Sequence, residues 1–372
     1  MKFFSRKEDS VVSQEQVLAE LRKIQDPDLH RDVVTLGFIK NLKIEGGDIT
    51  FDFVLTTPAC PAKDQMRDDA VMLLSALPGV SHVNVNMQAE VKQQPSFSKT
   101  AIAGVKNVVA VCSGKGGVGK STVAVNLAAA MAKLGASVGL LDADIYGPTI
   151  PIMLGRRDAN IEARGNLLLP IEAHNIRFMS MGLMAPGDKP LIWRGPMAHK
   201  ALQQTLLGVE WGNLDYLFVD LPPGTGDVHL TLVQSISVTG AVLVSTPQDV
   251  GLTISMKTYR MFVETNVKIL GIIENMSYYL CSHCGSREEI FGHGIVSQAA
   301  DKLGIPFLGE LPLERRVREF ADSGQPIVLA DPESTSAKSF FDITRKLAAQ
   351  ISITNFNSKP LEITEEETAE AN

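Results

Sequence analysis

Short apolar runs rich in β-branched residues alternate with helix-like stretches from Val105 to about Ile353. Strands that alternate with helices are typical of a mostly parallel, doubly wound sheet with helices on both faces. We therefore expect an α/β domain over residues 103–355. Its predicted strands are 107–111, 137–141, 176–179, 216–219, 241–245, 269–274 and 307–311.

A smaller unit is expected before it, at residues 13–90. Ser13 and Gln16 have the spacing of a helix capping box, and an apolar stripe follows them. A Glu-Gly-Gly-Asp turn between two strand-like segments predicts a hairpin. The order αββαβ indicates a small α+β domain. Its expected elements are a helix from Ser13, strands at 38–44 and 49–55, a helix at 64–77 and a strand at 80–85.

The segments outside these units lack periodicity. Residues 91–102 are polar and contain a proline, which favours a linker. Residues 1–12 are expected to form a flexible N-terminus. Residues 356–372 are expected to be a disordered acidic tail, because 361–372 contain five glutamates and no basic residue.

The composition of the 372 residues is ordinary for a globular protein, with 45% hydrophobic and 21% charged residues. No apolar stretch approaches the roughly 18 residues of a membrane span, and the first residues lack a signal-peptide core. A net charge of −7 does not favour nucleic-acid binding. Four cysteines in such a chain are typical of free thiols or metal ligands. We expect a cytoplasmic protein that binds neither membranes nor nucleic acids.

Residues 114–121, Gly-Lys-Gly-Gly-Val-Gly-Lys-Ser, match the phosphate-binding loop pattern, with an additional lysine at 115. A predicted strand precedes the loop, and a helix over 121–134 follows it, with Gly135 placed to end that helix. Such a loop presents backbone N–H groups to phosphate. We expect Lys120 to contact the β- and γ-phosphates and Ser121 to bind Mg²⁺. The nucleotide-binding residues predicted here are Gly114, Lys115, Gly116, Gly117, Val118, Gly119, Lys120, Ser121 and Thr122.

Two further segments carry carboxylates beside a predicted strand end. Asp220 ends an apolar run, where P-loop enzymes hold Mg²⁺ through water. Gly224, four residues later, is placed to sense a γ-phosphate with its backbone N–H. Asp142 and Asp144 are expected on the same side of a strand by alternation, one as a structural residue and one to orient the attacking water.

Cys281 and Cys284 form a C-x-x-C pair, a spacing that lets two thiolates bind one metal or one edge of a cluster. A redox dithiol would normally open a helix in a small thioredoxin-like domain. Zinc needs four ligands, to which His283 or His293 could contribute. Two chains in a C₂ dimer would instead supply four cysteines, which suits [4Fe-4S]. Spacing alone leaves iron–sulfur, zinc and chance open.

The other two cysteines have different contexts. Cys60 lies between a predicted strand and a helix, where a helix N-terminus lowers the pKa of a thiol, so it is a candidate transient thiol. A quiet loop cysteine is the alternative for that position. Cys112 ends the strand before the phosphate loop and is expected to be a packed small residue.

Together these motifs resemble the Mrp/ApbC family of iron–sulfur carrier ATPases, in the deviant P-loop class that also holds MinD, ParA and the nitrogenase iron protein. Residues 13–90 resemble the PaaD/SufT-type iron–sulfur assembly domain. Its matching motifs are Asp-Pro-Asp at 26–28, Leu-Gly-Phe at 36–38 and Thr-Thr-Pro-Ala-Cys-Pro at 56–61. The carrier motifs are the phosphate loop, Asp-Ala-Asp-Ile-Tyr-Gly-Pro, Trp-Arg-Gly-Pro-Met, Asp-Leu-Pro-Pro-Gly-Thr-Gly-Asp, Glu-Asn-Met-Ser and Cys-x-x-Cys.

The resemblance implies a role for each matching residue. Lys115 corresponds to a lysine that reaches the nucleotide of a partner subunit. Asp144 corresponds to the carboxylate that positions the attacking water, and Asn275 to an asparagine that recognises adenine, which implies ATP. Cys281 and Cys284 correspond to a pair that bridges a [4Fe-4S] cluster between two subunits. ATP, Mg²⁺ and the cluster are thus the implied ligands, and Lys115, Lys120 and Asp144 the implied catalytic residues.

The resemblance favours a homodimeric ATPase that loads a cluster from scaffold proteins and transfers it to apo iron–sulfur proteins. Two alternatives are a MinD/ParA-like positioning ATPase and a reductase-like electron donor. A positioning ATPase of the MinD type ends in a basic amphipathic helix, whereas this sequence ends in acidic residues. The electron donors use widely separated single cysteines and lack the first domain.

Overall fold

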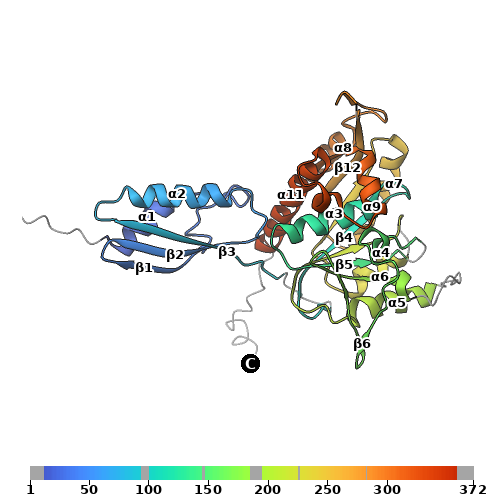
Figure 1. Cartoon of the computed structure of the whole chain (residues 1–372), viewed down its shortest axis with the longest axis horizontal. Coiled ribbons are helices and arrows are strands. Elements are labelled where there is room, and N and C mark those ends of the chain that lie inside the picture. The colour runs from blue at the N-terminus through green and yellow to red at the C-terminus, as the bar shows by residue number, and fades with distance from the viewer. Residues whose placement is uncertain are drawn as a thin grey trace, which may run out of the picture. The chain divides into compact units, whose positions relative to one another are not determined.

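The structure is a computed structural model that describes residues 12–93, 100–144, 147–184, 195–224, 227–281 and 283–357. The chain divides into two units (Figure 1). The first comprises Met1–Lys92 with Leu134–Ala136, and the second comprises Gln93–Lys133 with Ser137–Asn372.

The first unit has the element order predicted from its sequence. The expected capping box is confirmed, since Ser13 Oγ accepts from the Gln16 backbone N–H at 3.2 Å and the Ser13 N–H donates to Gln16 Oε1 at 2.9 Å. In the three-stranded sheet, β2 pairs antiparallel with β1 and parallel with β3. The strand predicted at 80–85 starts later and runs further. The elements are α1 (Gln14–Leu21), β1 (Ile39–Glu45), β2 (Asp48–Leu55), α2 (Lys63–Ser75) and β3 (His82–Ala89).

Among the described residues of the second unit, nine strands form one sheet with the order β13-β12-β11-β4-β10-β5-β9-β8, and β14 also pairs with β12. The ladders are parallel except at β8–β9 and β12–β13. The predicted doubly wound, mostly parallel α/β fold is therefore confirmed. The strands are β4 (Val105–Ser113), β5 (Val138–Asp142), β8 (Ile171–Ala173), β9 (Ile176–Ser180), β10 (Leu214–Asp220), β11 (Gly240–Ser245), β12 (Ile269–Leu280), β13 (Arg287–Glu288) and β14 (Phe307–Leu313).

Helices cover both faces of this sheet (Figure 1). Val108, Ala110 and Cys112 of β4 belong to one buried apolar cluster with side chains from α5, α6, α7 and α8. Because strand side chains alternate, Val109 and Val111 face the other side. There α3, α10 and α11 pack together. The helices are α3 (Lys120–Lys133), α5 (Gly195–Leu207), α6 (Asp227–Ser235), α7 (Asp249–Glu264), α8 (Ile295–Leu303), α10 (Ile327–Ala330) and α11 (Thr335–Asn357).

The remaining elements are short or peripheral. They are α4 (Ile150–Met153), β6 (Ala163–Arg164), β7 (Leu167–Leu168), η1 (Met181–Met184) and α9 (Arg315–Asp322). All seven strands predicted for this unit are present, although β12 continues six residues beyond its predicted end to Leu280. Among the described residues, no helix is both long and apolar enough to cross a bilayer.

Candidate nucleotide and cluster site

The phosphate-binding pattern lies between the end of β4 at Ser113 and the start of α3 at Lys120. Gly117 and Gly119 both have φ of 79°, a left-handed conformation that glycine adopts without steric cost. Ser113 Oγ donates to the Lys115 carbonyl at 3.0 Å and fixes the start of the loop. The loop lines a hollow of about 230 Å³ together with Asp144, Thr149, Met153 and Pro223.

Lys120 and Ser121 converge on Asp220, which lies at the end of β10 next to β4. Lys120 Nζ is 2.5 Å from Asp220 Oδ1, and Ser121 Oγ donates to Asp220 Oδ2 at 2.6 Å. Burial raises the pKa of the Asp220 carboxyl, while the Lys120 charge and the Ser121 hydroxyl oppose that rise. A hydroxyl and a carboxylate side by side are hard oxygen donors, so this pair fits Mg²⁺.

The expectation that Asp142 and Asp144 share a strand face is wrong, because β5 ends at Asp142. Asp142 is fully buried and accepts from the Asp144 N–H at 3.2 Å and from Ser180 Oγ at 3.1 Å. Burial, and then the charge of Asp220, raise the pKa of Asp142 to about 8. Asp144 instead lines the hollow beside the phosphate loop. Asp142 therefore shapes the turn, and Asp144 is the carboxylate that reaches the site.

Asn275 joins β12 to the phosphate loop. Its Nδ2 donates to the Val118 carbonyl at 2.7 Å, and the side chain is buried. At the next residue, Met276, φ is 56°, and the β12–β14 register shifts between Glu274 and Tyr278. This irregularity in β12 coincides with the point where Asn275 meets the loop. The role of Asn275 in recognising adenine stays a prediction.

Two hydrogen bonds near the phosphate loop were not predicted from the sequence, one from Gly224 and one from Lys115. The Gly224 N–H donates to the Ser113 carbonyl at 2.9 Å, so in this structure it is engaged by the protein itself and not directed to a γ-phosphate. Lys115 Nζ donates to Gln248 Oε1 at 2.6 Å. Gln248, the residue before α7, was not identified from the sequence, because it is 133 residues from Lys115.

The C-x-x-C pair lies in the turn that follows β12. The Cys281 N–H donates to the Ser286 carbonyl at 2.9 Å, and the Gly285 N–H donates to the Cys281 carbonyl at 2.8 Å. Ser286 Oγ is 3.1 Å from Cys284 Sγ, and this contact lowers the pKa of the Cys284 thiol. Cys284 and His283 are exposed. A readily formed thiolate is the form that binds metal.

The remaining cysteines lie away from this turn along the chain. The expectation of a lowered pKa at Cys60 is wrong, because burial raises the pKa of its thiol to about 11 despite hydrogen bonds from the backbone of Ala62 and Lys63. Cys112 is buried in the core with its Sγ 3.3 Å from the Val242 carbonyl oxygen, as predicted for a packing residue.

Some sequence motifs fall outside the described residues. These are the N-terminal residues 1–11, the middle of the expected linker at 94–99, residues 145–146, the Trp-Arg of Trp-Arg-Gly-Pro-Met at 193–194, the Thr-Gly at 225–226, Ser282 between the cysteines, and the acidic tail from 358.

Comparison with known proteins covers both units. Residues 104–348 match the profile of the NUBPL iron-transfer P-loop NTPase, and residues 14–87 match that of the iron–sulfur cluster assembly protein. An iron–sulfur cluster carrier protein from Synechocystis is 47% identical over 343 residues, which cover 91% of this chain and 97% of the relative.

Two further relatives match a smaller share of the chain. An iron–sulfur cluster transfer protein NUBPL from Dictyostelium discoideum is 46% identical over 265 residues, covering 71% of this chain and 82% of that protein. A solved nucleotide-binding protein from Archaeoglobus fulgidus in complex with ADP superposes with a TM-score of 0.56 at 38% identity. The superposition covers 64% of this chain and 92% of that one.

Proposed function

Because the chain belongs to the NUBPL iron-transfer P-loop NTPase family, we propose that it is an ATP-hydrolysing carrier that binds an iron–sulfur cluster and transfers it to apo-proteins. The relatives named as cluster carrier or transfer proteins support this proposal. The observation that carries it is the course of β12. This strand contacts the phosphate loop through Asn275 and leads directly into the turn with Cys281 and Cys284.

The nucleotide chemistry follows from the groups around the hollow. Lys120 balances the negative charge of the β- and γ-phosphates, and the loop N–H groups bind their oxygens. Ser121 and Asp220 would hold Mg²⁺, the aspartate through water, and the ion would neutralise charge on the phosphates. Asp144 orients the water that attacks the γ-phosphate, so ATP and water give ADP and phosphate. Asn275 contributes to binding of the base.

The cluster is the cargo, and its ligand requirement implies a dimer. Each chain supplies two thiolates from Cys281 and Cys284, whereas a [4Fe-4S] cluster needs about four. A two-fold axis between two chains provides the missing pair. Lys115 is released from Gln248 in that dimer and reaches the nucleotide of the partner subunit. Nucleotide state and cluster binding are then coupled through one interface.

The partners are scaffold proteins that supply the cluster and apo-proteins that receive it, and the compartment is the cytoplasm. The proposed domains are the assembly domain at 13–90 and the ATPase domain at 103–355. The ATPase domain carries the cluster on its paired cysteines.

A transfer assay with separated variants tests this function. Cluster-loaded wild-type protein is mixed with an apo iron–sulfur enzyme, and the recovered enzyme activity is followed with and without ATP and Mg²⁺. Cys281→Ser/Cys284→Ser removes transfer but keeps nucleotide binding, and Lys120→Ala removes ATP hydrolysis but keeps the two thiols. If the double cysteine variant transferred a cluster as well as the wild type, the carrier function would be wrong.

A further inference from the structure

The turn that carries Cys281 and Cys284 has few local supports. Its second arm, β13, is only Arg287–Glu288 and pairs with β12 at two positions, Leu280↔Arg287 and Tyr279↔Glu288. The described residues from 283 to 293 are exposed. A turn held by so few contacts opens at low free-energy cost, so any side chain that anchors it matters locally.

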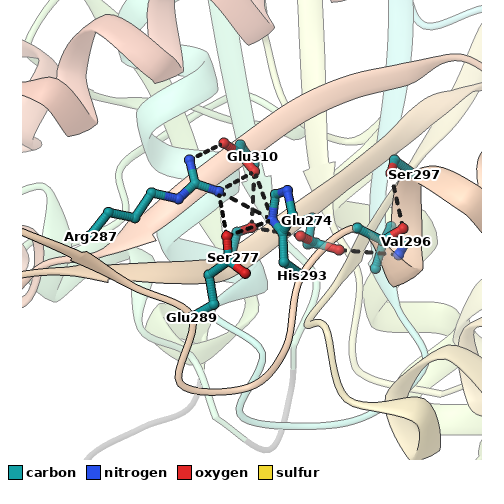
Figure 2. Close-up of polar contacts among 9 residues, drawn as sticks. Glu274, Ser277, Arg287, Glu289, His293, Val296, Ser297 and Glu310 are labelled. Atoms are coloured by element: carbon teal, nitrogen blue, oxygen red, sulfur yellow. Dashed lines mark hydrogen bonds and ion pairs between the residues drawn. The ribbon is translucent and has the colours of Figure 1, made fainter.

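Arg287 is such an anchor (Figure 2). Its two terminal nitrogens donate to the two carboxylate oxygens of Glu310 on β14, at 2.8 and 3.3 Å. The same guanidinium lies over the Tyr278 ring, 3.8 Å from its centroid. Arg287 also donates to His293 Nδ1 at 3.1 Å. A planar guanidinium with a bidentate carboxylate and an aromatic face is held in one orientation, which a lysine could not reproduce.

Glu310 is also contacted by Ser277 of β12 (Figure 2). Ser277 Oγ lies 3.1 Å from Glu310 Oε2 and 2.6 Å from Glu274 Oε1. Glu274 is buried and accepts the Val296 N–H at 3.1 Å from the start of α8. Partial burial alone would raise the pKa of Glu310, but its hydrogen bonds and ion pair with Arg287 lower the pKa overall. The carboxylate therefore stays ionised. The acceptor for Arg287 is therefore positioned by two strands and a helix.

The side chains of Glu274, His293 and Glu310 do not need a metal ion to balance their charge. Ligand atoms of Glu274, His293 and Glu310 lie within 4.8 Å of one another, a separation that a cation could bridge. Arg287 already donates to both Glu310 and His293, so the guanidinium provides the positive charge at this place. These side chains therefore form an ion-pair network, and Arg287 connects that network to the cysteine turn.

We propose that Arg287 is a positioning residue for the cysteine pair. It holds the base of the turn against Glu310 and Tyr278 and thereby acts as a clamp. The clamp keeps Cys281 and Cys284 in one arrangement, so that both thiolates meet the same cluster without first paying the entropy of ordering the turn. This inference rests on the proposed function for its consequence in cluster binding. The clamp itself is a property of the protein without cargo.

The partial exposure of the Arg287–Glu310 ion pair indicates that its effect is confined to the turn. The side chains of Arg287 and Glu310 are 38% and 30% exposed. Ion pairs of this exposure contribute little to the stability of a whole domain. Loss of Arg287 should therefore leave the fold and the nucleotide site intact while it loosens the cysteine turn.

The test compares Arg287→Ala and Arg287→Lys with Arg318→Ala, which removes an exposed ion pair to Asp322 on α9. The first readout is amide hydrogen exchange of Cys281 and Gly285 in the cluster-free protein. The second is the rate at which a chelator extracts iron from the reconstituted protein. Nucleotide affinity and the midpoint of thermal unfolding serve as controls for a general loss of structure.

We expect Arg287→Ala to speed exchange at these two amides. It should also speed iron loss by about 10-fold to 100-fold, the factor by which loss of residues that orient metal ligands lowers metal affinity. Arg287→Lys should restore little of either, and Arg318→Ala should match the wild type. Unchanged amide exchange in Arg287→Ala would overturn the clamp. Faster exchange with no cluster on the wild type would instead contradict the proposed function and leave the clamp standing.

Discussion

Lys120 Nζ lies 2.5 Å from Asp220 Oδ1, and both side chains are buried at the end of the β4–β10 pair. This ion pair joins the phosphate lysine to the carboxylate that is expected beside Mg²⁺. Binding of phosphate and Mg²⁺ then exchanges one set of charge contacts for another. Loss of one partner alone would leave the other as an uncompensated buried charge.

Removal of the lysine alone should be costly in the nucleotide-free protein. Lys120→Met leaves the Asp220 charge buried without its partner, and we expect the free energy of unfolding to fall by about 3 kcal/mol. Urea denaturation measures this difference. Lys115→Met is the control and should cost less than about 1 kcal/mol, because its hydrogen bond to Gln248 is not a buried charge pair. Adding Asp220→Asn to Lys120→Met should recover most of the loss, and failure to recover any would contradict the pairing.

Gly119 should tolerate no larger residue. A Cβ at this position would overlap Asn275 Nδ2, and φ of 79° disfavours any other residue. We expect Gly119→Ala to lower the free energy of unfolding of the nucleotide-free protein by about 2 kcal/mol. Gly117→Ala is the matched control, since Gly117 has the same φ of 79° but a Cβ there would meet no atom within 4 Å. Equal effects of the two substitutions on urea denaturation would show that Asn275 does not press on the loop.

The stability of the nucleotide-free protein should carry a pH dependence from Asp142. Its pKa is about 8 in the folded protein, against 3.8 for an ordinary aspartate. Between these values the folded state holds a proton that the unfolded state releases, so Asp142 favours folding at low pH and this benefit is lost as pH rises toward 8. The Asp142→Asn variant lacks this term. Relative to it, the wild type should lose up to about 1.4 kcal/mol per pH unit in this window. If the free energy of unfolding had the same pH dependence in the wild type and in Asp142→Asn, the raised pKa of Asp142 would be contradicted.

Cys60 and Cys284 should differ in reactivity. Burial raises the pKa of Cys60 to about 11, whereas Ser286 lowers the pKa of Cys284. Because the thiolate is the reactive form, iodoacetamide at pH 8 should alkylate Cys284 at least about tenfold faster than Cys60. Mass spectrometry of digested samples gives the two rates, and urea-unfolded protein shows the rates without structure. A Cys60 that reacts as fast as Cys284 in the folded protein would contradict its burial.

Local sequence patterns were sufficient for the framework of the ATPase unit. The phosphate loop requires a strand, glycines and a helix in immediate succession, and all three are contiguous between Val105 and Lys133. The strands of a buried parallel sheet are apolar throughout, so their positions were predicted within a few residues. Strands β8 and β13 were missed because two or three residues carry no periodicity.

Contacts between distant segments could not be predicted from local patterns. Arg287 and Glu310 are 23 residues apart, and their contact depends on the pairing of β12 with β14. The pKa of Cys60 was predicted in the wrong direction, because proximity to a helix was visible in the sequence but burial was not. The placement of Asp142 and Asp144 failed for a similar reason, since the position at which a strand ends is set by its neighbours.

The most direct test of the carrier account is anaerobic reconstitution of the wild type and of Cys281→Ser/Cys284→Ser with iron and sulfide. Mössbauer spectra, iron content and native mass are then measured on both. The account predicts about four irons in a [4Fe-4S] cluster per dimer of the wild type, and neither cluster nor bridged dimer in the variant. A wild type that stays free of cluster, or that holds only zinc, would contradict it.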